Sequence, residues 1–264
     1  RQVKKDKLTD AQWKKLLASG GVLDEEKRTW YPSENALKGS KIQKPGSIAA
    51  GFNLNNCNEF KDFLRPNMVS LSRCTQVLLE GITFQNSPAW TIHPLLCEHI
   101  TLRNVIVRNP WYGQNNDALD LESCRNGLVE GCSFDTGDDG ICIKSGRDAE
   151  GRKRGVPTEN IIVRNCIVFH GHGGFVIGSE MSGGVRNLFV SDCNFLGTDV
   201  GLRFKTARGR GGIVENIYVT DINMTNIPGE AILFDMYYMA KDPVSLNGEK
   251  NVLPEMKAEP LGEG

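Results

Sequence analysis

Short runs of alternating apolar and polar residues recur along most of this chain, and they predict β-strands. A typical run is QVLLEGI from Gln76, and NIIVRNC from Asn160 repeats its pattern. The six runs open at Gln76, His99, Asn126, Asn160, Asn187 and Asn216, in steps of 23, 27, 34, 27 and 29 residues. We find no helical periodicity in this region. Repeats of this length predict an all-β fold, a parallel β-helix in which each repeat forms one coil.

A second strand follows in each of the later repeats, and its alternation predicts which side chains face inward. Residues two apart lie on one face of a strand, and strands of neighbouring coils lie ~4.8 Å apart. The expected interior columns are Leu119, Ile141, Phe175, Leu202 and Ile232, and next to them Leu121, Ile143, Ile177, Phe204 and Phe234. The residues expected to point outward include Asp120, Cys142, Val176, Arg203, Lys144 and Lys205.

Polar tracts interrupt four successive repeats at nearly the same point. They are Asn115-Asn116-Asp117, Gly137-Asp138-Asp139, Gly171-His172-Gly173 and Arg203-Phe204-Lys205. Each tract alone has an ordinary structural explanation, because Asp is common in turns and charged residues often form a solvated strand face. Stacked on neighbouring coils, three carboxylates, an imidazole and two cations converge. That set predicts acid/base hydrolysis of an acidic polymer.

Asp199 shares the offset of Asp138 and His172 within its repeat, 12 residues after the opening of the first strand. It lacks the flanking glycines of the other tracts. We therefore assign Asp199 a structural role.

The charge and composition of the chain argue against nucleic acid and membrane as binding partners. The net charge of −1 over 264 residues gives no basic field that would favour nucleic acid. Residues 1–44 carry 11 Lys and Arg against 6 Asp and Glu, which we interpret as a solvated face. No apolar run is long enough to span a membrane, and the start, RQVKKDK, has no signal-peptide core.

The eight cysteines are predicted to be buried thiols rather than disulfides. Cys132, Cys166 and Cys193 share one register, and Ile82 and Ile222 occupy the same place in their repeats. A position that accepts Cys or Ile is typical of a small apolar site. No CxxC pair or Cys/His cluster has zinc spacing, so we expect neither a metal nor a cofactor.

The ends of the chain are organised differently. Residues 1–63 form an expected N-terminal lobe, with a short helix in LTDAQWKKLLASGG that Thr9 and Gln12 cap, and a long loop over residues 31–64. Residues 64–246 form the expected parallel β-helix, and residues 247–264 a polar tail. Neither end has a solenoid cap in its sequence. We therefore expect that the chain is a piece of a longer one.

The stretch from Arg65 to Tyr238 resembles the polygalacturonases of glycoside hydrolase family 28, especially the bacterial members. The family tracts Gly-Asp-Asp and Gly-His-Gly occur unchanged, Asn-Thr-Asp occurs with Asn116 for Thr, and Arg-Ile-Lys occurs with Phe204 for Ile. The segments FQNSPAWTIHP and GSEMSGGVRN also read like bacterial members.

The resemblance implies a right-handed parallel β-helix that hydrolyses α-1,4-galacturonosidic bonds with inversion. By the family pattern Asp138 is the general acid, and Asp117 and Asp139 position and deprotonate the attacking water. His172 would sit beside the acid and tune its protonation. The substrate-binding residues would be Asn115, Arg203 and Lys205.

Three alternatives stay open on the sequence. They are a rhamnogalacturonan hydrolase, a pectate lyase that uses Ca²⁺ and β-elimination, and a non-catalytic pectin-binding solenoid. The aromatic loop Trp111-Tyr112 before Asp117 and the lobe aromatics Trp13, Trp30 and Tyr31 favour a groove closed at one end, and hence release of units from a chain end. We expect a monomer, secreted or periplasmic, that acts on an acidic polysaccharide or oligogalacturonide and binds neither nucleic acid nor membrane.

Overall fold

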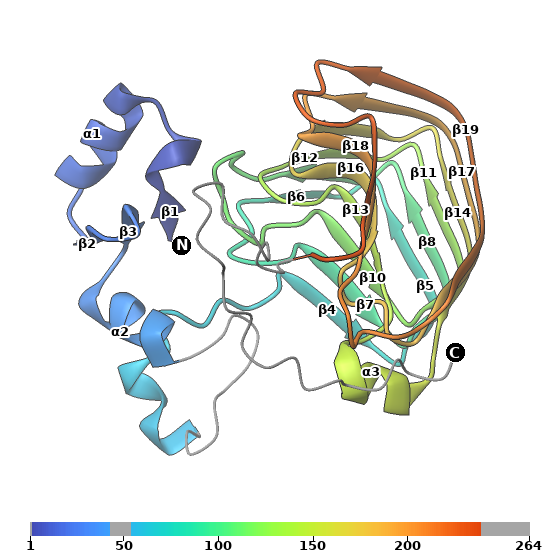
Figure 1. Ribbon diagram of the computed structural model, residues 1–264, viewed down its shortest axis with the longest axis horizontal. Helices are drawn as coiled ribbons and strands as arrows, with labels where there is room; N and C mark the ends of the chain where they lie inside the picture. The colour runs from blue at the N-terminus through green and yellow to red at the C-terminus, as the bar shows by residue number, and fades with distance from the viewer. Residues whose placement is uncertain (1, 43–53, 239–264) are drawn as a thin grey trace, which may run out of the picture.

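The computed structural model describes residues 2–42 and 54–238, and most of them form a parallel β-solenoid (Figure 1). Seven parallel strands stack into one sheet in the order β20-β18-β16-β13-β10-β7-β4. Their bounds are β4 Val69–Ser72, β7 Ile92–Leu95, β10 Leu119–Glu122, β13 Ile141–Lys144, β16 Gly173–Gly178, β18 Val200–Lys205 and β20 Ile232–Asp235. The prediction of a parallel β-helix is confirmed.

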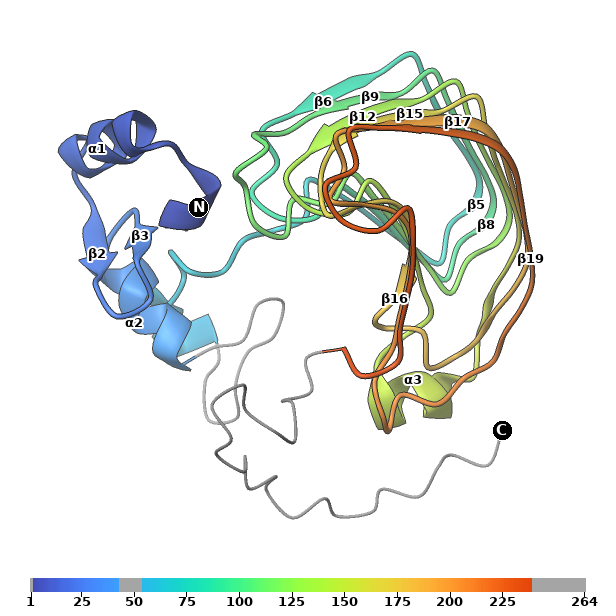
Figure 2. The ribbon, with the colours of Figure 1, turned by 45° about the horizontal axis from the view of Figure 1, so that its top comes forward.

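A second, ten-stranded parallel sheet closes the other walls of the coil (Figure 2). Its strands are β5 Thr75–Glu80, β6 Thr83–Gln85, β8 Glu98–Arg103, β9 Ile106–Arg108, β11 Arg125–Glu130, β12 Ser133–Thr136, β14 Thr158–Arg164, β15 Ile167–His170, β17 Val185–Leu196 and β19 Val214–Thr225. The long strand β17 pairs with both β14 and β15. Two walls that are separate strands in earlier coils therefore merge into one.

The predicted interior columns are confirmed in register. Leu119 pairs with Ile141, Ile141 with Phe175, and Phe175 with Leu202, and all four are buried. The last rung differs from the prediction, because Ile232 is 57% and Phe234 67% exposed. No strand follows β20 in the sheet of described residues, so the inner face of this rung has no further coil to pack against.

Several outward-pointing side chains of the same sheet are buried, although we expected this face to be exposed to solvent. Asp120, Cys142 and Val176 are each 0% exposed, and Lys144 is 3% exposed. Alternation places them correctly on the outer face, but this face is itself covered. The ring of Trp90, for example, lies 4.9 Å from the Lys144 ammonium. The solenoid therefore has a second buried layer, made of polar and charged groups.

Two helices lie where we expected none. Helix α3 (Asp148–Arg154) follows β13 and accounts for the longest step between repeats. Helix α2 (Glu34–Ile42) occupies the predicted long loop. Its start is capped by Ser33, whose hydroxyl accepts a hydrogen bond from the backbone N–H of Ala36 at 3.0 Å. An Asn, a Gly and a Ser within the helix weaken its helical pattern.

The N-terminal lobe lies beside the solenoid (Figure 1). Strands β1 (Val3–Lys4), β3 (Thr29–Tyr31) and β2 (Val22–Asp24) form a small antiparallel sheet, and short 3-10 helices span Lys5–Lys7 and Leu54–Glu59. Helix α1 (Asp10–Ala18) has the predicted Thr9–Gln12 capping box. The Gln2 side chain donates to Gln114 at 2.7 Å, so the lobe touches the loop that precedes Asp117.

The eight cysteines are all free, as predicted, and six of them are buried, whereas Cys57 and Cys74 are half-buried. Among the helices of the described residues, none is long and apolar enough to cross a membrane. The predicted tail, residues 247–264, lies outside the described residues.

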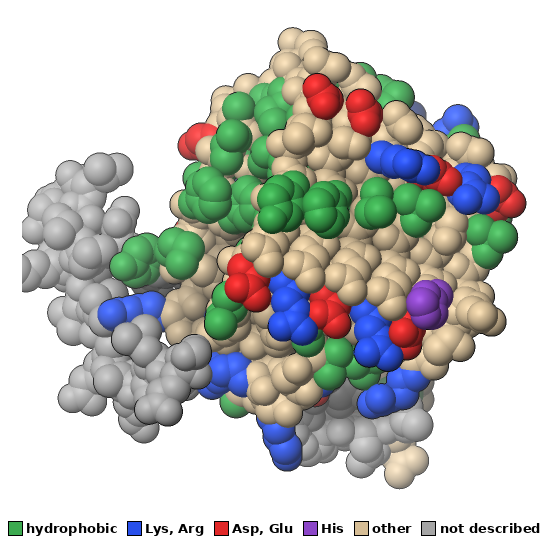
Figure 3. All heavy atoms as spheres, turned by 90° about the vertical axis from the view of Figure 1, so that its right-hand side faces the viewer, with side chains coloured by type: hydrophobic (Ala, Val, Ile, Leu, Met, Phe, Trp, Pro, Cys, Tyr) green, Lys and Arg blue, Asp and Glu red, His purple; other side chains and the backbone are tan. Residues whose placement is uncertain are grey.

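A row of hydrophobic side chains crosses the outer face of the ten-stranded sheet (Figure 3). Phe189 of β17 and Tyr218 of β19 are paired in this sheet and about half exposed, and their rings stack at 4.9 Å. On the same strand β17, Phe195 points inward and is 0% exposed. One strand thus carries the same side chain in two environments.

We predict that Phe195→Ala lowers the free energy of unfolding by about 3–5 kcal/mol, because it leaves a cavity in the core. The matched variant Phe189→Ala should cost about 1 kcal/mol or less, since it removes only a half-exposed stack. Urea unfolding of the two variants measures the difference. Equal losses would contradict the assignment of the two faces.

Candidate active site

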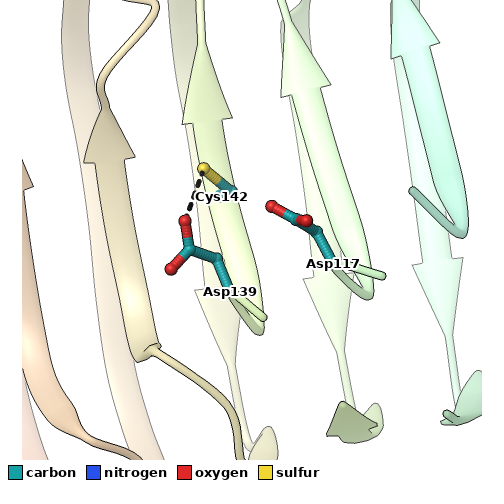
Figure 4. A group of neighbouring side chains, drawn as sticks. All are labelled: Asp117, Asp139 and Cys142. Atoms are coloured by element: carbon teal, nitrogen blue, oxygen red, sulfur yellow. Dashed lines mark hydrogen bonds between the residues drawn. The ribbon is translucent and has the colours of Figure 1, made fainter. Parts of the chain in front are cut away.

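The three carboxylates of the polar tracts come together before strands β10 and β13. Figure 4 shows two of them, Asp117 and Asp139, on neighbouring coils. Their oxygens and the Cys142 sulfur lie within 4.8 Å of one another. Asp117 is 3% and Asp139 1% exposed, whereas Asp138 is half-buried. Stacking of the coils brings them together. The backbone N–H of Ala118, the residue after Asp117, donates to the Asp139 carbonyl at 3.0 Å.

The turns that carry the acids need glycine because other backbone approaches closely. A Cβ on Gly137 would collide with the carbonyls of Trp111 and Gly113. Gly171 has a φ of +84°, and a Cβ there would collide with the Asp138 carbonyl. The glycines that frame these tracts thus allow the aromatic loop and the two polar turns to pack tightly.

Opposite pKa shifts separate the two buried acids. Burial, and then the neighbouring charges of Asp120, Asp138 and Asp139, raises the pKa of Asp117 well above its usual range. Burial also opposes ionisation of Asp139, but the ammonium groups of Lys205 and Lys144 outweigh it and lower its pKa. Within the cluster, the fold therefore favours the protonated form of Asp117 and the ionised form of Asp139.

Lys205 is not free in this structure, although we predicted it as a substrate-binding cation. Its ammonium lies 2.6 Å from Asp139 Oδ2, and the residue is 7% exposed. Asp139 in turn raises the pKa of Lys205, against the opposing effect of burial. The first partner of this cation is thus the acidic cluster itself.

Asp138 is held by backbone groups. Its two oxygens accept hydrogen bonds from the N–H groups of Asn115 at 2.9 Å and Asp139 at 3.0 Å. The Asn115 side chain accepts from the Arg65 guanidinium at 2.8 Å. Asn115, predicted to bind substrate, therefore positions Asp138 through its main chain.

His172 lies next to Asp138, as predicted, and its backbone N–H donates to the Asp138 carbonyl at 3.1 Å. Its ring Nδ1 contacts Asp199 Oδ2 at 2.6 Å. Asp199, to which we gave a structural role, is therefore a direct partner of a candidate site residue. The shared offset within the repeats was the available signal, and we discounted it because no glycines flank Asp199.

Arg203 and Tyr238 extend the site toward the later coils. The Arg203 guanidinium lies 5.5 Å and the Lys205 ammonium 5.2 Å from the centre of the Tyr238 ring. The Nε atom of Arg203 is buried and makes no hydrogen bond within the described part of the chain. Sequence reasoning missed Tyr238, because it lies after the last strand, where no repeat fixes its position.

A second ionic network lies beside the acids, and no sequence pattern indicated it. The Lys144 ammonium contacts Glu180 at 2.9 Å and Asp120 Oδ1 at 3.6 Å. Burial raises the pKa of Glu180, but the Lys144 charge outweighs it and lowers that pKa to about 2. Burial raises the pKa of Asp120 to about 8, although Lys144 acts in the opposite direction.

Asp117, Asp139 and Cys142 are also the one group with metal-like spacing that we find among residues 2–42 and 54–238. The Lys205 ammonium already neutralises Asp139 there, and burial raises the pKa of the Cys142 thiol well above its usual range. A neutral thiol and a paired carboxylate are poor ligands for a cation.

These observations define a parallel β-helix whose outer face holds a buried carboxylate cluster beside two cations and an imidazole. The profile of Glycosyl hydrolases family 28 matches residues 33–254, and the chain belongs to that family.

Three similar proteins are named as polygalacturonases or galacturonosidases. A "Probable polygalacturonase" of Vitis vinifera is 32% identical over 163 residues, which are 61% of this chain and 33% of that protein. An "Exo-poly-alpha-D-galacturonosidase" of Dickeya chrysanthemi is 26% identical over 199 residues, 75% of this chain and 32% of that protein. The structure of an exopolygalacturonase from Thermotoga maritima is 39% identical with a TM-score of 0.59, covering 72% of this chain and 49% of that one. The chain thus spans about a third to about a half of the length of these relatives.

We predict that Asp120→Asn stabilises the protein progressively as pH rises. The pKa of Asp120 is about 8 in the fold against 3.8 for an ordinary Asp, so ionisation favours the unfolded chain between those values. The stability gained over the wild type should grow with a slope approaching about 1.4 kcal/mol per pH unit between these pKa values and level off outside them.

The measurement is the free energy of unfolding from pH 4 to 9, with the exposed Asp192→Asn as control. A stability difference between Asp120→Asn and wild type that does not change with pH would contradict the assignment.

Proposed function

We propose that the protein hydrolyses the α-1,4-galacturonosidic bonds of polygalacturonate or pectin by an inverting acid/base mechanism. The observation that carries this proposal is the cluster of Asp117, Asp138 and Asp139, in which the half-buried Asp138 adjoins Asp139, a buried acid whose pKa, despite burial, is lowered by Lys205 and Lys144. An inverting glycosidase needs a protonated carboxyl for the leaving oxygen and a carboxylate that activates water.

Asp138 is the proposed general acid. It is the half-buried member of the three, so it is the one accessible to a bound sugar, whereas Asp117 and Asp139 are buried. Inverting enzymes usually separate their acid and base by ~6.5–9.5 Å to make room for water. The closer pair Asp117 and Asp139, within 4.8 Å, is better suited to hold that water jointly.

The attacking water would bind between Asp117 and Asp139. Each of them has a buried Oδ1 atom with no hydrogen-bond partner among the described residues. Unsatisfied buried oxygens are costly, and a bound water would satisfy both. Asp139, kept ionised by Lys205, accepts the proton of the water, and Asp117 orients the water.

The cations explain the preference for an acidic polymer. A galacturonate carboxylate can approach the guanidinium of Arg203, next to Tyr238 and Lys205, and form a charge-assisted contact that fixes the register of cleavage. Because Lys205 also holds Asp139, substrate binding and ionisation of the base would depend on one ammonium group.

Release of units from a chain end is supported by the loop before Asp117. Trp111 and Tyr112 pack edge to face at 5.7 Å there, and the N-terminal lobe contacts Gln114 of the same loop. Such a wall would close the groove to internal stretches of polymer. We propose a secreted or periplasmic location, where such a polymer would be met.

We predict monomer or one short oligomer as the first product from polygalacturonate, with viscosity falling slowly. The time course should include rhamnogalacturonan, methyl-esterified pectin and a chelator arm. Slower cleavage of the esterified polymer is expected, since its carboxylates are masked.

Other results would point elsewhere. An early ladder of oligomers with rapid loss of viscosity would show internal cleavage. A product that absorbs in the ultraviolet and disappears with chelator would indicate a lyase, preferential release from rhamnogalacturonan would indicate that substrate, and binding without any product would indicate a non-catalytic solenoid.

We predict that Asp138→Asn and Asp139→Asn each lower kcat by about 10²–10⁴-fold, as expected for lost general acid or base catalysis. Their chemical rescue should differ. An activated leaving group needs no acid and should restore Asp138→Asn alone, whereas azide, which needs no base, should restore Asp139→Asn alone. Asp192→Asn serves as the surface control. If Asp138→Asn kept more than about a tenth of wild-type kcat, Asp138 would not be the acid.

A further inference from the structure

We infer that Asp199 is a positioning residue, which holds His172 with Nδ1 protonated and leaves Nε2 as the ring nitrogen available to the reacting groups. This inference rests on the proposed function of Asp138 as the acid, and on the hydrogen bond between the His172 backbone N–H and the Asp138 carbonyl. Nothing in the family motifs points to Asp199, which lies four residues before the Arg-Phe-Lys tract.

The contact is built from the main chain upward. The backbone N–H of Asp199 donates to Gly171 O at 2.8 Å, and its carbonyl accepts from Gly229 N–H at 3.0 Å, so the residue is fixed between two coils. From this position its carboxylate reaches His172 Nδ1 at 2.6 Å. The backbone N–H of His172 is bonded to the Asp138 carbonyl. Hydrogen bonds therefore connect Asp199, His172 and Asp138 across adjacent coils.

The chemistry of the pair sets the tautomer. A carboxylate only accepts hydrogen bonds, so a neutral imidazole facing it must carry its proton on Nδ1. Within residues 2–42 and 54–238 we find no second hydrogen bond to the His172 ring. Asp199 is thus the one group seen there that selects between the tautomers, and it also fixes the ring plane.

The chain contains a matched control pair. His170, two residues before His172, contacts Asp135 Oδ1 through its own Nδ1 at 2.9 Å. The side chains of this pair are 56% and 41% exposed, against 33% and 50% for His172 and Asp199. The two pairs share chemistry and inter-coil geometry, but of the two only His172 has its backbone bonded to the turn of Asp138.

The test compares Asp199→Asn with Asp135→Asn in ¹⁵N-histidine-labelled protein at about pH 8.5, where an ordinary imidazole is neutral. Long-range ¹H–¹⁵N spectra report which ring nitrogen carries the proton. An amide can donate to a bare Nδ1, so Asp199→Asn should raise the Nε2–H population of His172. Asp135→Asn should change only the His170 signals.

Steady-state kinetics then test whether the tautomer of His172 affects catalysis. We expect Asp199→Asn to lower kcat on the order of tenfold or more with KM within about twofold, and Asp135→Asn to leave both unchanged. In a His172→Gln background, adding Asp199→Asn should cause no further loss, because the positioned ring is gone. Circular dichroism and the unfolding midpoint check that the variants keep the wild-type fold.

Three results would overturn the inference. The first is an unchanged His172 spectrum in Asp199→Asn. The second is an altered tautomer with unchanged kcat, and the third is a full additional loss in the His172→Gln background. The spectra decide the contact even for a protein without hydrolytic activity, so failure of this inference is distinguishable from failure of the proposed function.

Discussion

In-register stacking of parallel coils is the constraint on which the whole structure depends. Strands of neighbouring coils lie ~4.8 Å apart, so residues at the same offset in successive repeats must become neighbours. The apolar column from Leu119 to Leu202 fixes that register from the inside. An asparagine ladder fixes it at one corner, where the amide of Asn160 donates to Asn126 at 3.1 Å and the amide of Asn187 to Asn160 at 3.2 Å. A slip of one residue would turn the core outward and scatter the acids.

The same stacking creates the unusual electrostatics of the site. Acids on adjacent rungs cannot all ionise, because they are buried and a few ångströms apart. The cations on neighbouring rungs then determine which of the acids ionises. Lys205 favours the ionised form of Asp139. Burial and the neighbouring carboxylates favour the protonated form of Asp117, which has no ion pair with a cation of the described residues. The protonation of each group thus depends on its position along the solenoid rather than on its residue type.

Sequence reasoning could predict the features that depend on periodicity. The repeat steps and strand alternation predicted the β-helix, the interior columns and the convergence of the three acids with His172. Sequence reasoning could not predict whether residues from other coils cover the outer face of a strand. Lys144 and Asp120 were placed on the correct side of the strand, but Trp90, which covers part of that side, comes from another coil.

Sequence reasoning also missed Tyr238, helix α2 and the Lys205–Asp139 pair, each for a different reason. Tyr238 lies beyond the last repeat, and helix α2 depends on a serine cap within a weak helical pattern. The pairing of Lys205 with Asp139 was missed because alternation cannot show which of several nearby groups an ammonium contacts.

The stereochemistry of the first product tests the central account most directly. If Asp117 and Asp139 hold a water opposite the bond that Asp138 protonates, the α-linked substrate must yield a product whose new reducing end is the β-anomer. Proton NMR of the anomeric signals during the first turnovers, before mutarotation, measures this. The β-anomer is the result that the account predicts. An α-anomeric first product would require a covalent intermediate on one of the acids and would contradict it.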